Sequence, residues 1–170
     1  MAKFNISFKI LVALFVTAFL LISPAQAQKF ENYPATQIYK GKPAKLQLTK
    51  DNGGLTFKTR ITEAAKKGVN FAGQYSIVEI GCGSSCLIAY VVDLKSGKLF
   101  SFPLGGEENY QMQLQYKPNS RLIKVVWNDI NAAQNKACVI EYLEMQKDKF
   151  KTINRTTMPS DGYLCDDYVN

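Results

Sequence analysis

Cysteines have the widest chemical range of the residue types in this chain of 170 residues, which contains four of them. Cys82 and Cys86 stand close together as Cys82-Gly-Ser-Ser-Cys86, with three small residues between the thiols. Redox-active pairs usually enclose two residues at the start of a helix, where the helix dipole lowers the thiolate pKa. Here two apolar runs flank the pair, so the spacing favours a structural disulfide. The other two cysteines are Cys138 and Cys165.

The sequence contains no histidine, which narrows the chemistry further. Ser-His-Asp catalysis, Cys-His catalysis and the usual zinc sites all need an imidazole. Ser84 and Ser85 lack such a base, and no Gly-x-Ser-x-Gly motif surrounds them. We interpret them as small residues that allow a tight loop. We predict no catalytic residue, no cofactor and no metal site, and we favour a non-enzymatic protein.

Acidic side chains are the remaining candidates for catalysis or metal binding. Glu107 and Glu108 are adjacent, so they would point apart, and a solvated loop is favoured over a glycosidase pair. The glycines before them, Gly105 and Gly106, are too few for a phosphate-binding loop. Two runs offer oxygen ligands for calcium, but neither has the spacing of a calcium loop. These runs contain Asn128, Asp129, Asn131, Asp161, Asp166 and Asp167.

The apolar runs around the first cysteine pair predict a β-hairpin. If Gly83, Ser84 and Ser85 form its loop, Cys82 faces Cys86 across the ladder. Alternation of side chains along each strand then predicts the cross-strand pairs. One face would pair Ile80 with Ile88, Val78 with Tyr90 and Ser76 with Val92, and the other Gly81 with Leu87, Glu79 with Ala89 and Ile77 with Val91.

The N-terminal segment resembles a secretory signal peptide, which we assign to residues 1–27. Lys3 and Lys9 precede an apolar run over residues 10–22, and Ala25-Gln-Ala27 fits a cleavage site. The run is too short for a membrane span, which needs roughly 20 residues. We therefore expect no transmembrane segment after cleavage, and one periplasmic or secreted domain over residues 28–170.

An even number of cysteines in an exported chain predicts two disulfides, with three connectivities open. We favour Cys82–Cys86, from the hairpin, and Cys138–Cys165, which would tie the C-terminal tail to a strand. On the chain-entropy model, the larger loop contributes about 3 to 4 kcal/mol.

Charge gives little evidence of a partner. The formal net charge is +7, and it falls to +5 when Lys3 and Lys9 are removed with the signal peptide. The lysines are scattered, so the sequence predicts no nucleic-acid partner. Weak attraction to anionic envelope polymers or to an acidic partner is compatible with this charge. A solvated surface is the favoured interpretation.

The remaining pattern predicts an α+β fold, mainly an antiparallel β meander of about six to eight strands with one short helix near its N-terminal side. The helix is expected over residues 59–67, with Gly68 just after its last turn. Short strands are expected on both sides of the turn at 51–54. The other expected strands cover residues 99–102, 111–116, 122–127, 137–145 and 150–153, and an irregular tail follows.

Four segments resemble a family of small secreted bacterial proteins without an established activity. They cover about the middle third of the chain, and the resemblance implies compartment and fold more than function. They are Phe57-Lys-Thr-Arg-Ile-Thr-Glu-Ala-Ala65, Asn70-Phe-Ala-Gly-Gln-Tyr75, Gly81-Cys-Gly-Ser-Ser-Cys86 and Asp93-Leu-Lys-Ser-Gly-Lys98.

The Cys82–Cys86 loop is also similar in arrangement to a loop of the periplasmic inhibitors of vertebrate-type lysozyme. Those inhibitors plug the enzyme's cleft with a short disulfide-closed loop. Their loop has four residues between the cysteines and includes a histidine, whereas this one has three and no histidine. The resemblance therefore implies inhibition as a hypothesis and transfers no contact residue.

These observations favour a monomeric, exported binding protein that meets a protein of the envelope or extracellular space. Its concrete form would be an inhibitor of an envelope-degrading enzyme or an immunity protein against a toxin. Two alternatives remain, a hydrolase acting on envelope polymers and a structural or assembly factor of the envelope. The candidate partner-binding residues are Gly83, Ser84, Ser85, Gly105, Gly106, Glu107, Glu108 and Asn109.

Overall fold

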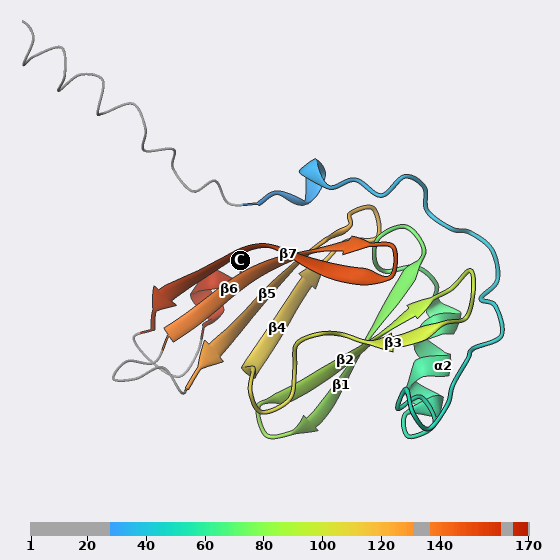
Figure 1. Cartoon of the computed structure of the whole chain (residues 1–170), viewed down its shortest axis with the longest axis horizontal. Coiled ribbons are helices and arrows are strands. Elements are labelled where there is room, and N and C mark those ends of the chain that lie inside the picture. The colour runs from blue at the N-terminus through green and yellow to red at the C-terminus, as the bar shows by residue number, and fades with distance from the viewer. Residues whose placement is uncertain (1–27, 131–136, 161–164, 170) are drawn as a thin grey trace, which may run out of the picture.

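The computed structural model describes residues 28–130, 137–160 and 165–169, so the predicted signal peptide lies outside the described residues. Within them the chain forms seven strands, one α-helix and two 3-10 helices (Figure 1). In chain order these are η1 (Phe30–Asn32), α2 (Lys58–Lys67), β1 (Tyr75–Gly83), β2 (Cys86–Asp93), β3 (Leu99–Ser101), β4 (Tyr110–Tyr116), β5 (Leu122–Asp129), β6 (Ala137–Gln146), β7 (Lys149–Pro159) and η2 (Asp166–Tyr168).

The strands form two separate antiparallel sheets. One has the order β1-β2-β3 and the other the order β4-β5-β6-β7. The predicted α+β class, strand number and single α-helix are confirmed in the described residues. The meander is nevertheless divided between β3 and β4, which the prediction did not include. The physical reason is that β1 and β2 are apolar on both faces, so the second sheet stacks on the first.

The main core lies between the two sheets. The three-stranded sheet contributes Ile77, Ala89 and Val91, all at most 3% exposed. The facing sheet contributes side chains that alternate along its strands, as expected for a sheet with one buried face. These are Met112, Ile123, Val125, Trp127, Val139, Leu143 and Met145.

A second core lies between α2 and the other face of the three-stranded sheet. Ile61 and Ala65, one helical turn apart, bury the inner side of the helix against Val78, Ile80 and Val92. The predicted helix is thus confirmed to within one residue at its start, and Gly68 follows it with a positive φ of 93°. The three-stranded sheet is therefore the middle of three layers.

The outer face of the four-stranded sheet carries a third, smaller core. Cys138 and Cys165 form the predicted disulfide, with their Cα atoms 5.6 Å apart. Val126, Ile140 and the short helix η2 pack around it. The prediction that Cys165 holds the C-terminal tail is confirmed for residues 165–169.

The segment before α2 differs from the prediction, because it forms an extended arm and not short strands. Its backbone lies along the turns of the first sheet, with the Ala44 amide donating to the Leu94 carbonyl (2.9 Å) and the Gln47 amide to the Gly97 carbonyl (2.8 Å). Gly97 has φ = 76°, and a Cβ there would lie 2.1 Å from the Lys45 carbonyl oxygen. Only glycine fits this approach.

Candidate functional site

The β1–β2 hairpin ends in the first disulfide, as predicted. The six predicted cross-strand pairs between residues 76–81 and 87–92 are all present in the ladder, which also pairs Tyr75 with Asp93. The end of the hairpin differs in detail, because Gly83 pairs with Cys86 and the turn contains only Ser84 and Ser85. The ladder therefore shifts between Gly81 and Gly83. Cys82 and Cys86 remain bonded, with their Cα atoms 5.1 Å apart.

This end of the hairpin is exposed and conformationally restricted. Cys82, Gly83 and Ser84 are exposed, whereas the strands that lead to them are buried in two cores. Ser85 has φ = 60°. Gly83 has φ = 141°, a backbone conformation that favours glycine. The disulfide and the ladder together hold a small protruding loop in place.

The second predicted binding segment lies directly beside the first. The Gly106 amide donates to the Leu87 carbonyl (2.8 Å), and the Gln111 amide donates to the Ser85 carbonyl (2.9 Å). Within the loop, the Gly105 amide donates to Asn109 Oδ1 at 2.7 Å. The loop predicted to be solvated is thus tied to the hairpin by backbone hydrogen bonds. We call residues 82–86 and 105–109 together the tip.

A cleft of about 510 Å³ opens next to the tip, between the two sheets. Gly105, Glu108 and Asn109 form part of its wall, so the tip and the cleft are continuous. Asp129 and Arg155, from β5 and β7, also line the cleft. The cleft therefore offers both acidic and basic groups to a bound molecule.

Arg155 is the functional candidate that sequence reasoning missed. Its guanidinium lies 5.2 Å from the centre of the Trp127 ring and 3.9 Å from Glu141 Oε2. Glu141 is 5% exposed, and the Thr152 hydroxyl donates to its Oε1 at 2.7 Å. The Arg155 side chain is 56% exposed. The Arg155 guanidinium is thus positioned by Trp127 and Glu141, and the side chain is still exposed to the cleft. A guanidinium in this position can bind a carboxylate or another anion.

The four aromatic residues considered for a sugar-stacking platform, Trp127, Tyr116, Tyr142 and Phe100, are buried or partly buried. Trp127 is 3% exposed, and Arg155 covers its ring. Tyr116, Tyr142 and Phe100 are partly buried, and Tyr116 donates its hydroxyl proton to Glu79 Oε1 at 2.8 Å. Burial raises the pKa of Tyr116 above its usual value, and the Glu79 carboxylate raises it further.

Neither a metal cluster nor a membrane-spanning helix is found in the parts of the chain that the structure describes. No group of three or more His, Cys, Asp or Glu side chains there is placed to hold a metal ion. Of the calcium candidates, Asn131 and Asp161 lie outside the described residues, and Asp166 accepts a hydrogen bond from the Gln113 side chain (2.7 Å). Helices long and apolar enough for a membrane span are absent from the same described ranges.

The chain was compared with protein-family models, curated proteins and solved structures. Nothing matches. The resemblances to secreted bacterial proteins and to lysozyme inhibitors therefore stay predictions. Inference about function therefore rests on the tip and the cleft.

Proposed function

We propose that the protein is an exported binding protein whose tip and adjoining cleft hold a protein partner. The observation that carries this proposal is the junction of the two segments of the tip: the loop at 105–109, which forms part of the cleft wall, is joined to the hairpin end by backbone hydrogen bonds. A surface fixed before binding loses little conformational entropy on association. Two disulfides are typical of proteins in oxidising compartments, which supports a periplasmic or secreted location.

The partner that suits this surface is an enzyme with a basic active-site cleft. Glu107 and Glu108 are exposed on the tip, although the chain as a whole is positively charged. Complementary charge steers association and suppresses wrong partners. The concrete form of the proposal is inhibition of an envelope-degrading enzyme, or immunity to a toxin with such an activity, by a monomeric protein.

Inhibition assays on purified peptidoglycan hydrolases test this proposal. We expect wild-type protein to inhibit at least one such enzyme stoichiometrically. Ser84→Arg places a long cation on the tip, and we expect it to weaken inhibition by about tenfold or more. Thr59→Arg is the matched control, because Thr59 is exposed on α2, away from the tip (Figure 1). Equal potency of wild type and Ser84→Arg would contradict the role of the tip. Failure to inhibit any of these hydrolases would contradict the proposal that the protein is an inhibitor.

One observation favours a second candidate, hydrolysis of an envelope polymer. Glu108 and Asp129 line the same cleft, so two carboxylates face one space large enough for part of a polymer. This candidate predicts that the protein alone releases fragments from cell-wall material. Glu108→Gln or Asp129→Asn should then abolish the release, whereas Ser84→Arg should not. Turnover with this pattern would replace the binding proposal.

A further inference from the structure

A basic groove lies at the end of the molecule opposite the tip. Two adjoining hollows, of about 330 and 840 Å³, share the residues Thr36, Arg121, Met145 and Lys147. Lys95 lines the first hollow and Lys149 lines the second. We call this feature the basic groove and define it by these six residues. It lies at the end of β6 and near the start of β1, whereas the tip lies at the end of β1 and the start of β4 (Figure 1).

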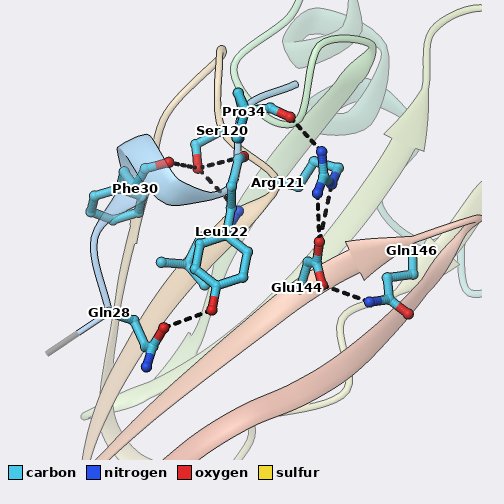
Figure 2. A network of polar contacts seen from close by, with 9 residues as sticks. Gln28, Phe30, Pro34, Ser120, Arg121, Leu122, Glu144 and Gln146 are labelled. Carbon is cyan, nitrogen blue, oxygen red and sulfur yellow. Dashed lines mark hydrogen bonds and ion pairs between the residues drawn. The ribbon is translucent and has the colours of Figure 1, made fainter. Parts of the chain in front are cut away.

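The floor of the groove is held rigidly. Figure 2 shows Arg121 directed at Glu144, whose Oε1 accepts hydrogen bonds from Arg121 Nε (3.1 Å) and Nη2 (2.7 Å). Arg121 Nη1 also donates to the Pro34 carbonyl of the arm, and Gln146 Nε2 donates to Glu144 Oε2. Burial alone raises the pKa of Glu144, but the bonds from Arg121 and Gln146 outweigh it and hold this pKa below its usual value.

The β6–β7 turn presents Lys147 to the groove and turns its acidic neighbour elsewhere. Lys147 and Asp148 both have positive φ, 48° and 64°. Asp148 accepts hydrogen bonds from the Tyr75 hydroxyl (2.7 Å) and from Lys98 Nζ (3.1 Å). The carboxylate nearest to Lys147 in sequence is therefore already occupied by other partners.

Three lysines of the groove have no ion-pair partner among the described residues. In the described residues, the ion pairs involve Lys98, Lys117, Arg121 and Arg155, and none involves Lys95, Lys147 or Lys149. Lys95 Nζ lies 5.9 Å from the Tyr39 ring, which restricts its position. Glu144 is the acidic residue that lines the hollows, and Arg121 pairs with it. The remaining excess is three positive charges around one continuous groove.

We propose that the basic groove binds a ligand with several closely spaced phosphate groups. A single carboxylate would balance only one of the three positive charges, whereas successive phosphates can balance all of them. Each phosphate offers several strong acceptor oxygens and more charge than a carboxylate, which suits lysines that approach from different elements. An oligophosphate and the headgroups of anionic phospholipids share this chemistry.

Binding of inorganic tripolyphosphate tests the groove directly, with protein expressed from the full chain. We expect binding by isothermal titration calorimetry at low ionic strength, weakening as salt is added because these lysines are exposed. The double variant Lys95→Glu plus Lys147→Glu should lose affinity by about tenfold or more, because each substitution replaces an attraction with a repulsion. Lys50→Glu plus Lys58→Glu makes the same change in net charge at exposed lysines outside the groove, and should change affinity by about twofold or less.

Vesicles distinguish the two sources of phosphate. Sedimentation with phosphatidylglycerol vesicles, compared with phosphatidylcholine vesicles, reports headgroup binding. Retention on the anionic vesicles, lost in the groove variant, assigns a lipid ligand, and tripolyphosphate binding without retention assigns a free phosphate compound. The proposal is overturned if wild type binds neither probe, or if both double variants lose affinity equally, since the effect would then be one of overall charge. These results are independent of whether the tip binds a partner.

Discussion

At the scale of single residues, Tyr75 and Asp148 link the two sheets. Tyr75 begins β1, and its hydroxyl donates to Asp148 in the turn between β6 and β7. This bond holds the pKa of Asp148 below its usual value, with a further contribution from Lys98. Burial, followed by the Asp148 bond, raises the pKa of Tyr75. At neutral pH the pair is therefore a neutral phenol and a carboxylate.

Replacing Tyr75 with phenylalanine removes the hydrogen bond to Asp148, and the resulting loss of stability should depend on pH. A carboxyl whose folded pKa is depressed stabilises the fold above its unfolded pKa of about 3.9, and this contribution is lost as pH falls through the folded pKa. Tyr75→Phe removes the main cause of the depression. At pH 7 we expect its free energy of unfolding to be about 1 kcal/mol lower than that of wild type. The deficit should shrink below about pH 4.

Urea unfolding at pH 7 and pH 3 measures this difference. Tyr33→Phe is the matched control, because the Tyr33 hydroxyl donates to the Gln28 side-chain oxygen (2.6 Å), an acceptor that does not titrate. Its deficit should be the same at both pH values. A constant deficit in Tyr75→Phe as well would show that the Tyr75 hydroxyl does not lower the pKa of Asp148.

Single residues also show where sequence reasoning succeeds. The pairing of Ile77 with Val91 followed from period-two counting alone, because both residues lie on one short hairpin. Arg155 and Lys147 did not emerge as candidates. Arg155 lies over the Trp127 ring, and Lys147 lines the same hollow as Arg121. These neighbours come from other strands, so no local spacing in the sequence predicts them.

At the scale of elements, the arm before α2 is the main departure from prediction. The alternation of Leu46 and Leu48 suggested a strand, but these side chains pack against the second core from an extended segment without a ladder. Asn52 explains the turn that follows, since its Oδ1 accepts from the amides of Thr49 (2.9 Å) and Gly54 (3.0 Å). Side chain–backbone bonds of this kind compete with strand formation.

The arm depends on its close approach to Gly97. Gly97→Ala would force a Cβ against the Lys45 carbonyl at a positive φ, so we expect it to lower the free energy of unfolding by about 2 kcal/mol or more. Amide hydrogen exchange should accelerate at Gln47, which bonds to Gly97, more than at Ile77 in β1.

Gly81→Ala is the control for this substitution. Gly81 has open space around it and no positive φ, so its replacement should change stability by about 0.5 kcal/mol or less. Equal effects of the two substitutions in urea unfolding would exclude the steric explanation.

Strand β7 departs from prediction for a different reason. The expected strand at 150–153 extends over Lys149–Pro159. It forms an edge of the four-stranded sheet, and most of its residues are exposed or only partly buried. An edge strand of this kind lacks the apolar alternation by which strands are recognised, so its length could not be predicted.

At the scale of the whole molecule, the two disulfides stabilise different parts of the fold. Cys138–Cys165 joins residues 27 positions apart and ties the C-terminal segment over the four-stranded sheet. Cys82–Cys86 spans only 4 positions and closes the tip. Both connectivities could be predicted, one from hairpin geometry and the other from the even cysteine count.

Paired serine substitutions should separate these roles. On the chain-entropy model, Cys138→Ser plus Cys165→Ser costs about 3 to 4 kcal/mol, and Cys82→Ser plus Cys86→Ser about 2 kcal/mol. Urea unfolding of both variants measures the order. The tip variant should lose partner binding while it stays folded at 25 °C, and the reverse order of stabilities would contradict the assignment.

The position of the β1–β2 hairpin in the middle layer determines how cooperatively the protein unfolds. Its side chains alternate between the core under α2 and the core between the sheets, so neither core is complete without the same two strands. Melting of the helix layer would expose one side of the hairpin and weaken the support of the other. The described layers should therefore unfold as one cooperative unit, and the tip should persist until that transition.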